Sequence, residues 1–272
     1  MSIVLMIAAG IIVLSLLVIV IGSLIFKGKI SRDINRLMSA DRNTVPEVIR
    51  ADKLEGLPEP VKRYLKYAGI EGKRELLRLR ISQKGEIRTD RDQKWMPFRA
   101  QQFISTSKPG FLWRANTFPI LVRDMFDGNR GSMRINFLGL RNLAIAETRE
   151  IDQGSLIRYL AEMVWYPTAF LRKEINWHPM DESTAMATIT VGKTTAEGVF
   201  HFNAKGEIEM FTAKRYREIH GHFELDKWIA HVEEYRNAEG FMIPFKGTVT
   251  WKLQEGDLDY FRFELTGYHR LT

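Results

Sequence analysis

In the stretch FMIPFKGTVTWKL, residues 241–253, large apolar side chains occupy alternate positions. A period of two is typical of a β-strand that buries one face and exposes the other. The same alternation returns in FRFEL, residues 261–265. The predicted buried face carries Phe241, Ile243, Phe245, Val249, Trp251, Leu253, Phe261, Phe263 and Leu265. Pro244 and Gly247 favour a sheet edge or a bulge within the first of these strands.

Strand patterns recur through most of the chain. Further strands are predicted at residues 77–82, 96–107, 111–118, 120–126 and 131–137. Lys84 and Gly85 are predicted to turn the chain after the first of them, and Asp127-Gly128 is a hairpin signal before the last. With about a dozen strands, few helices and no repeated βαβ spacing, the chain is predicted to be α+β with one long antiparallel sheet.

Three helical segments are predicted outside the N-terminal region. Residues 57–69 combine an apolar stripe with a terminal glycine, which is typical of an amphipathic helix and its C-terminal cap. Ser155 is predicted to cap a helix over residues 156–164. Thr44 is predicted to cap a shorter helix, with a proline and a glutamate in its first turn.

A sheet of this size with one apolar face must curl around something. The helix at 155–164 is the natural filler, so we expect a strongly curved half-barrel packed on one or two helices. Such a sheet is similar in character to bacterial lipoprotein carriers of the LolA type. The comparison concerns the fold, and a fold does not imply a function.

The N-terminal residues 1–26 contain no charged side chain, and residues 3–26 are nearly all Ile, Leu, Val or Ala. As a helix this run rises about 36 Å, enough to cross a hydrocarbon core of about 30 Å with some tilt. A cleaved signal peptide would need a basic start, a shorter apolar run and a small-residue cleavage site. Because these features are missing, residues 1–26 are predicted to be an uncleaved transmembrane anchor.

The charges beside the anchor predict its orientation. Lys27, Lys29, Arg32 and Arg36 follow the apolar run, and no Lys or Arg precedes it. The positive-inside bias therefore predicts a single-pass protein of the cell membrane with its globular domain in the cytoplasm. The extracytoplasmic side is the alternative, because a carrier-like fold is more usual there. The same four cations are predicted to contact anionic lipid headgroups.

The predicted plan is an anchor at 1–26, a basic juxtamembrane helical stem at 27–56 and a β-rich globular domain at 57–272. The 272 residues include 40 Lys and Arg against 33 Asp and Glu, a net charge of +7, and no cysteine. The lack of cysteine excludes disulfides, thiolate zinc sites and cysteine nucleophiles. Nucleic-acid binding is not predicted, because the cations are neither clustered among aromatics nor set in a helix-turn-helix pattern.

Several short motifs occur in a fixed order along the chain. They are Leu57-Pro-x-Pro-Val-Lys-Arg-Tyr-Leu-x-Tyr-Ala-Gly69, Trp95-x-Pro97, Pro109-Gly-Phe-x-Trp113, Asp127-Gly128 with Gly131-x-Met133, and Arg158-Tyr-Leu-Ala-Glu-x-x-Trp-x-Pro167. Over most of residues 57–270 the chain thereby resembles a widespread bacterial family of membrane-anchored proteins known only as a domain of unknown function. The resemblance implies bacterial origin and one continuous domain, and it brings no catalytic residue.

One group of side chains predicts a binding site. The candidate ligand-binding residues are Tyr159, Glu162, Trp165, Tyr166 and Trp251. If the 155–164 helix lines the concave sheet, these residues border an apolar pocket, where burial would let Glu162 bind or donate a proton. The alternative is that Arg158 and Glu162 form an exposed i,i+4 ion pair beside core aromatics.

Histidines and common motifs predict no catalytic or metal site. His220 with His222, and His231 with Glu233, could each share a strand face as metal ligands, but no third ligand follows at a motif spacing. Structural roles are the simpler interpretation of His178 and His201. The chain has no Gly-x-Ser-x-Gly, phosphate loop, Rossmann fingerprint or His-Glu-x-x-His, so no catalytic residue and no cofactor are assigned.

Three functions therefore stay open. The first is a membrane-anchored module that binds a lipid-like or other apolar ligand at the membrane surface. The second is an enzyme that acts on a membrane-associated substrate with Glu162 and a histidine. The third is a scaffold that presents an apolar patch or a sheet edge to other proteins. A wide apolar cavity would favour the first, a buried carboxylate–histidine contact the second, and a filled core with an exposed apolar patch the third.

Overall fold

The structure, a computed structural model, describes residues 3–39, 44–219 and 221–271. Its strands form one antiparallel sheet of 13 strands, ordered β6-β5-β4-β3-β2-β1-β13-β12-β11-β10-β9-β8-β7 from edge to edge. The strands are β1 (Arg78–Ile87), β2 (Met96–Ser105), β3 (Gly110–Thr117), β4 (Ile120–Phe126), β5 (Gly131–Phe137), β6 (Arg141–Ala146), β7 (Ile175–Pro179), β8 (Thr184–Val191), β9 (Thr194–Phe202), β10 (Ile208–Ile219), β11 (His222–Ala238), β12 (Phe241–Leu253) and β13 (Gly256–Arg270).

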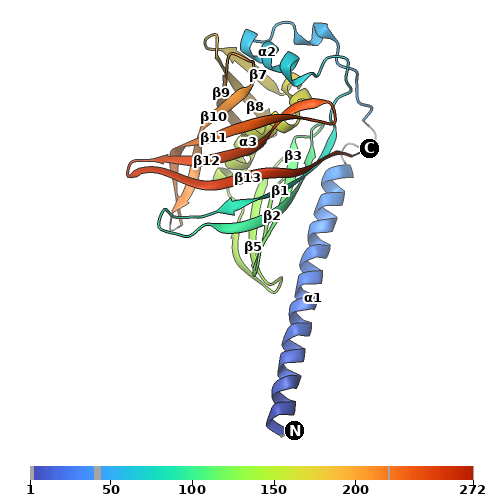
Figure 1. Ribbon diagram of the computed structural model, residues 1–272, viewed down its shortest axis with the longest axis vertical. Helices are drawn as coiled ribbons and strands as arrows, with labels where there is room; N and C mark the ends of the chain where they lie inside the picture. Colours follow the sequence, from blue (N-terminus) through green and yellow to red (C-terminus); the bar gives the residue numbers. More distant parts are fainter. Residues whose placement is uncertain (1–2, 40–43, 220, 272) are drawn as a thin grey trace.

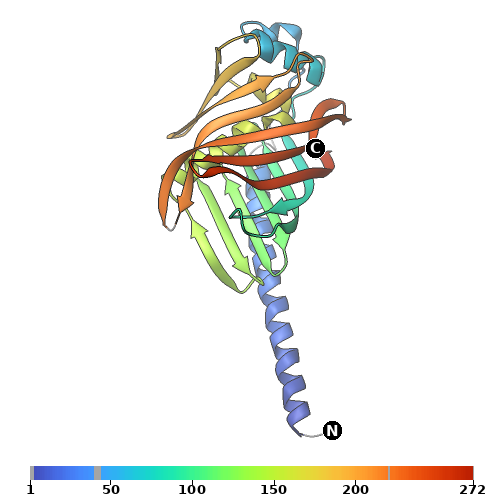
Figure 2. The same cartoon turned by 60° about the vertical axis from the view of Figure 1, so that its left-hand side comes forward.

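Three α-helices accompany the sheet in the described residues: α1 (Ile3–Ser39), α2 (Glu59–Ala68) and α3 (Arg149–Ala161). Short 3₁₀ helices occupy Ala51–Leu54, Glu162–Trp165 and Pro167–Leu171. The sheet curls around α3, which packs on β4, β5, β9 and β10, and α2 covers the end of the sheet far from the free part of α1 (Figures 1 and 2). The predicted α+β half-barrel is confirmed.

The alternation in residues 241–253 places its apolar side chains in the core as predicted. Phe241 and Ile243 are fully buried, and Val249 and Trp251 are nearly so. Only the second half of β12, from Lys246, pairs with β13, so Pro244 pairs with β11 alone. Pro244 thus has the local edge position that its missing N–H requires.

The predicted turn at Lys84 and Gly85 is wrong. β1 continues to Ile87, and Gly85 pairs with Phe98 on one side and Phe263 on the other. A side chain at Gly85 would overlap the backbone oxygen of Arg262 and the ring of Phe98. The glycine therefore allows close packing inside the sheet and does not mark a turn.

Two predicted helix starts also differ from the structure. The helix after Thr44 is absent: Ile49 N–H donates to the Lys73 carbonyl at 2.8 Å, and these backbone bonds hold the segment extended. The helix predicted over 156–164 with Ser155 as its cap begins seven residues earlier, at Arg149, with Thr148 as its cap. The Thr148 hydroxyl accepts from the Ile151 N–H at 3.4 Å. Ser155, the predicted cap, therefore lies inside α3.

Helix α1 has a free half and a docked half. Its N-terminal half projects away from the domain (Figure 1), and α1 is long and apolar enough to cross a membrane. The other half packs on the outer face of the sheet, where Phe26, Ile30 and Leu37 form a small apolar cluster with Leu112 and Met125. The domain therefore rests directly on the helix.

Candidate functional site

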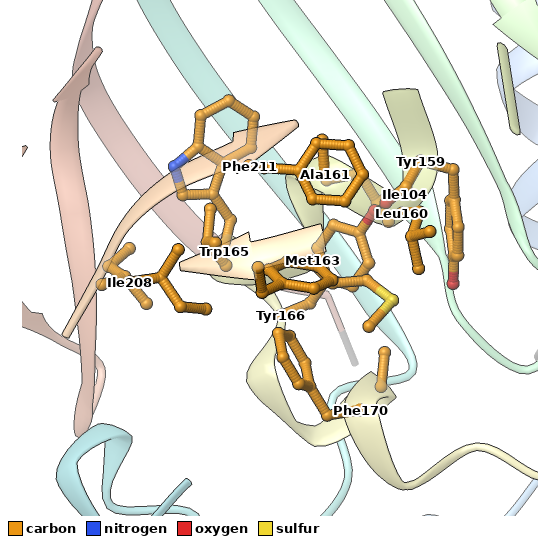
Figure 3. Packing of buried hydrophobic residues seen from close by; sticks show 14 of the residues in the cluster. Ile104, Tyr159, Leu160, Ala161, Met163, Trp165, Tyr166, Phe170, Ile208 and Phe211 are labelled. Atoms are coloured by element: carbon orange, nitrogen blue, oxygen red, sulfur yellow. Dashed lines mark hydrogen bonds between the residues drawn. The ribbon is translucent and has the colours of Figure 1, made fainter. Parts of the chain in front are cut away.

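The structure brings four of the five predicted site residues together, with three of them buried and Glu162 largely so. Tyr159, Trp165 and Tyr166 are each at most 3% exposed, and they lie in the packed interior around α3 (Figure 3). The Tyr166 hydroxyl donates to the Tyr159 carbonyl at 2.6 Å. Trp165 fills the space where β12 and β13 separate: its Nε1 donates to the Pro244 carbonyl at 3.2 Å, and its ring meets Phe263 edge-on at 5.2 Å. The assignment of these residues to ligand binding stays a prediction.

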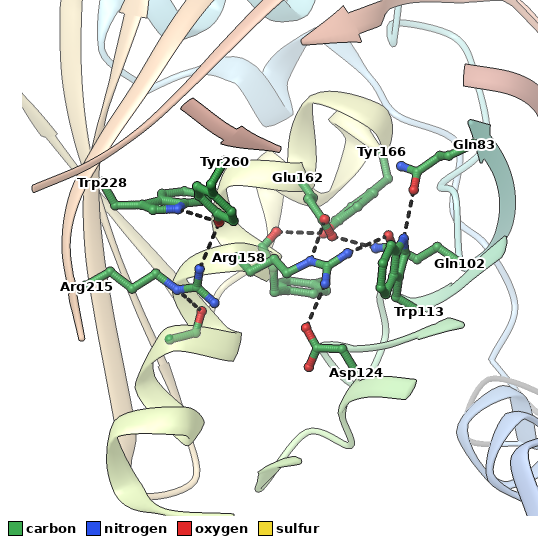
Figure 4. Close-up of polar contacts among 12 residues, drawn as sticks. Gln83, Gln102, Trp113, Asp124, Arg158, Glu162, Tyr166, Arg215, Trp228 and Tyr260 are labelled. Atoms are coloured by element: carbon green, nitrogen blue, oxygen red, sulfur yellow. Dashed lines mark hydrogen bonds and ion pairs between the residues drawn. The ribbon is translucent and has the colours of Figure 1, made fainter. Parts of the chain in front are cut away.

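Glu162, the fourth member, belongs to a buried ionic network (Figure 4). Arg158 Nε donates to its Oε1 at 2.7 Å, and Gln102 Nε2 donates to its Oε2 at 2.5 Å. Arg158 also donates to Asp124 Oδ2 at 2.7 Å and to Gln102 Oε1 at 3.1 Å. The i,i+4 pair of Arg158 and Glu162 therefore exists, but it lies in the core and is not exposed.

Burial sets the electrostatics of this network. Removal from water raises the pKa of Glu162 above its usual value, although Arg158 and Gln102 act in the opposite direction. Burial likewise opposes the charge on Arg158, but the Glu162 and Asp124 carboxylates more than compensate and raise its pKa. Both oxygens of Glu162 have donors, so the network is internally satisfied, as buried charges must be.

Trp251, the fifth predicted residue, belongs to a different cluster. Its ring stacks on Tyr260 at 5.9 Å, and the Arg215 guanidinium lies over Trp228 at 5.2 Å. Trp228 Nε1 donates to the Tyr260 hydroxyl at 3.0 Å (Figure 4), and Arg215 Nε donates to the Gly154 carbonyl at 3.2 Å. This cluster ties α3 to the late strands.

The histidines lie apart from Glu162 in the described part of the chain. His201 contacts the Thr212 hydroxyl at 3.3 Å, and His178, His222 and His231 are exposed. His220 lies outside the described residues. Among the residues that the structure describes, no group of three His, Asp or Glu side chains could hold a metal ion.

A large cavity opens where α3 begins. It has a volume of about 1210 Å³ and is bounded by the start of α3, by β4 and β5, by the β8–β9 turn, by β10 and by α1. Its lining comprises Arg36, Arg123, Met125, Asp127, Asn129, Arg130, Gly131, Ser132, Arg134, Glu147, Thr148, Arg149, Glu150, Asp152, Gln153, Lys193, Thr194, Thr195 and Tyr216. A second cavity of about 700 Å³ lies over β1, β2 and β13. None of the five predicted site residues lines either cavity.

Cations dominate the larger cavity, with six basic residues against four acidic ones. Two of the acidic side chains are engaged by backbone N–H groups: Asp127 accepts from Arg130 at 2.9 Å, and Asp152 accepts from Gly131 at 2.6 Å. Among the described residues, Arg130, Arg149 and Lys193 form no ion pair and are exposed. The cavity therefore offers unpaired positive charge to a ligand.

The sequence does not mark this cavity, because its walls come from segments far apart in the chain. The three unpaired cations lie in the β4–β5 turn, at the start of α3 and in the β8–β9 turn. No run of basic residues marks them in the sequence. They meet because the curled sheet brings β5 and β9 to opposite sides of α3.

Comparison with protein families gives one match, to a family of unknown function, DUF6544, over residues 47–263. The chain belongs to the DUF6544 family. The resemblance inferred from the motifs is thereby confirmed at the level of an uncharacterised family. The DUF6544 match includes every residue of the large cavity except Arg36. Comparison with curated proteins gives no match.

Two solved structures resemble the DUF6544 chain. One is a LolA superfamily protein from Nitrosomonas europaea, with 8% identity, a TM-score of 0.45, and coverage of 78% of this chain and 92% of that one. The other is a domain described as an outer membrane lipoprotein-sorting protein from Vibrio parahaemolyticus, with 8% identity, a TM-score of 0.44, and coverage of 78% and 94%. At such low identity and TM-score, neither similarity indicates what this chain binds.

Proposed function

We propose that the protein is a membrane-anchored binding module that holds an anionic, lipid-like ligand in the large cavity at the start of α3. The observation that carries this proposal is the set of three unpaired cations, Arg130, Arg149 and Lys193, around a cavity of about 1210 Å³. This volume is at the scale of sites for small organic ligands. Phosphate and carboxylate groups are the partners that guanidinium and ammonium groups bind best.

Two arginines on the cavity wall add donors. Arg123 is buried and donates to the Ser132 hydroxyl at 2.7 Å, while its Nε–H has no acceptor among the described residues. Arg134 pairs with Glu147 at 3.1 Å and also keeps a buried Nε–H without an acceptor there. The two guanidinium groups add positive charge to the cavity wall, and such charge favours a ligand rich in acceptors.

The membrane part of the proposal rests on α1. We propose that its apolar half spans the membrane of the cell and that the positive charge of Lys27, Lys29, Arg32 and Arg36 is attracted to anionic headgroups on the cytoplasmic side. Each such cation gains about 1 kcal/mol near an anionic surface. Arg36 also borders the cavity, so the cavity lies beside the helix that would anchor the domain.

The enzyme alternative has less support. The contact that would favour it, a buried carboxylate–histidine pair, is not made by Glu162, whose described hydrogen bonds go to Arg158 and Gln102. The interior around Trp165 is filled by side chains. A ligand is therefore better accommodated in the charged cavity than in the apolar pocket expected from the sequence.

Native mass spectrometry of the full-length protein released from detergent tests the proposal. Phosphatidylglycerol and phosphatidylcholine of equal chain length are added in equal amounts. The variant carrying Arg130→Gln, Arg149→Gln and Lys193→Gln is compared with a control carrying Lys94→Gln, Lys173→Gln and Lys205→Gln. The control loses the same charge at exposed positions outside the cavity.

We expect the natural protein and the control to retain phosphatidylglycerol over phosphatidylcholine, and the cavity variant to lose this preference. A loss of about 1.4 kcal/mol in binding free energy corresponds to a tenfold weaker complex. Equal retention of the two lipids by the natural protein, or an unchanged preference in the cavity variant, would contradict the proposal.

A further inference from the structure

Two neighbouring turns expose large apolar side chains at the end of the half-barrel beside α1. Phe118, in the turn between β3 and β4, is 85% exposed, and Leu140, in the turn between β5 and β6, is 46% exposed. The Leu138 N–H donates to the Pro119 carbonyl at 3.0 Å, so the two turns form one surface. Phe137, at 40% exposed, adds to it. We call this surface the apolar rim.

The apolar rim touches α1 inside its uncharged run. A side chain at Gly22 would overlap the side chain of Leu140, and a side chain at Gly139 would overlap the backbone of Ser23. The two glycines thus permit direct contact between the β5–β6 turn and the helix. Figures 1 and 2 both show this end of the sheet lying alongside α1.

This contact fixes the height of the rim relative to a membrane. Residues 3–21 of α1 lie outside the domain, and all of them except Ile19 are exposed. These 19 residues rise about 28 Å, close to the hydrocarbon thickness of about 30 Å. Gly22 follows directly, and the first cation, Lys27, lies about 7.5 Å further along the axis. The rim therefore contacts α1 at the height where hydrocarbon gives way to headgroups.

We propose that the apolar rim inserts into the surface of the bilayer that α1 crosses, as a second membrane contact of the domain. The inference rests on the anchoring role of α1 in the proposed function. Phe118 and Leu140 would lie among the first methylenes of the lipid chains, the depth typical of interfacial apolar side chains. Arg141, directly after Leu140, is exposed and would lie with Lys27 and Lys29 at the level of the lipid phosphates.

The lipid surface is the occupant that this geometry favours. Among the large apolar side chains of the described domain, Phe118 has the highest exposed fraction, and its turn is hydrogen-bonded to the β5–β6 turn that touches Gly22. A partner protein could reach the rim only by displacing lipid around α1. The close contact at Gly22 also prevents the domain from lifting away without breaking its packing on the helix.

Single-cysteine labelling tests the proposal, because the chain contains no cysteine of its own. Phe118→Cys and Leu140→Cys each carry the environment-sensitive fluorophore NBD in the full-length protein. Met180→Cys, 57% exposed, is the matched control. Met180 lies in the loop between β7 and β8. In this loop the Glu182 carbonyl accepts a hydrogen bond from Arg63 of α2, so the loop lies at the end of the sheet far from the free part of α1. Val13→Cys, in the middle of the free part of α1, reports whether this helix crosses the bilayer.

The proteins are placed in vesicles of phosphatidylcholine and phosphatidylglycerol, with or without lipids that carry a nitroxide near the headgroup end of the acyl chain. We expect blue-shifted emission and loss of fluorescence to the nitroxide at Phe118 and Leu140, and neither change at Met180. Probes at Phe118 and Leu140 that behave like the Met180 probe, while Val13 reports hydrocarbon, would overturn the rim contact and leave anchoring intact. A Val13 probe that reports water would overturn both.

Discussion

Asp33 of α1 and Arg123 of β4 form an ion pair of 2.7 Å between the long apolar helix and the wall of the large cavity. The side chain of Arg123 is 7% exposed and that of Asp33 is 19% exposed, so the pair is largely removed from water. Together with the apolar cluster around Phe26, it makes α1 part of the folded domain. A change in the cavity wall is therefore coupled to the position of the helix.

Asp33→Asn should destabilise the docked helix. The substitution leaves a buried guanidinium without its carboxylate, and breaking a buried pair from one side costs about 3–5 kcal/mol. Thermal unfolding of the full-length protein in detergent measures the loss. Glu264→Gln is the control, because it removes the exposed pair with Lys84 and should cost less than about 1 kcal/mol. Equal small losses in the two variants would mean that the Asp33 pair is solvated.

Leu160→Asp should unfold the domain. Leu160 is fully buried in α3 within the curve of the sheet (Figure 3), and a buried unpaired carboxylate costs several kcal/mol, comparable with a total stability of about 5–15 kcal/mol. Leu225→Asp places the same charge at a side chain that is 47% exposed and should be tolerated. Circular dichroism during heating compares the two. An unchanged melting temperature for Leu160→Asp would place α3 on the surface.

Glu162→Gln should change how stability depends on pH. Burial raises the pKa of Glu162 above its usual 4.5, so the folded protein holds this proton to a higher pH than the unfolded chain does. The stabilising contribution of the proton is complete below the unfolded pKa and is lost as pH rises through the folded pKa. The variant cannot lose this proton, so its stability relative to the natural protein should increase as pH rises above 4.5.

Urea unfolding at several pH values from about 4 to 7 measures the difference in unfolding free energy between the variant and the natural protein. Any effect of the substitution that does not depend on pH shifts this difference equally at every pH and leaves the trend visible. Glu264→Gln, at a more exposed carboxylate, is the matched control and should show no comparable trend. A difference that stays constant across the range would mean that the Arg158 charge fully offsets burial at Glu162.

The orientation of α1 can be tested with reporter fusions at the C-terminus. Lys27, Lys29, Arg32 and Arg36 on the domain side predict a cytoplasmic domain. Alkaline phosphatase fused there should be inactive, because it needs an oxidising compartment. Replacing the four cations with Gln is expected to raise the phosphatase activity. Full activity in the natural sequence would place the domain outside the cytoplasm.

The strands could be predicted because alternation reports one buried face, and that signal is local. Where a residue's environment is set by distant segments, the prediction failed. Gly85 resembled a turn residue, but the backbone oxygen of Arg262 and the ring of Phe98, on the two neighbouring strands, leave no room for a side chain there. The segment after Thr44 resembled a helix start, but its backbone pairs with residues near Lys73.

In the candidate site, too, local features could be predicted and features that depend on distant segments could not. The aromatic group around Trp165 was recognised as a cluster because its members are adjacent in sequence, whereas its dense packing depends on β12 and β13. The charged cavity was not predicted, because Arg130, Arg149 and Lys193 meet only after the sheet curls. Charge count alone could not distinguish these three cations from those that are paired elsewhere.

The position of β13 also bears on how the protein is made. Its 15 residues follow the other twelve described strands in sequence, yet they lie between β1 and β12 and join the first six strands to the other six. During synthesis, strands β1–β6 and β7–β12 therefore leave the ribosome before the strand that joins them. Until then they can form only two separate half-sheets with open backbone edges. The half-barrel can form as one sheet only once β13 has been synthesised, because β13 is the strand that pairs with both halves.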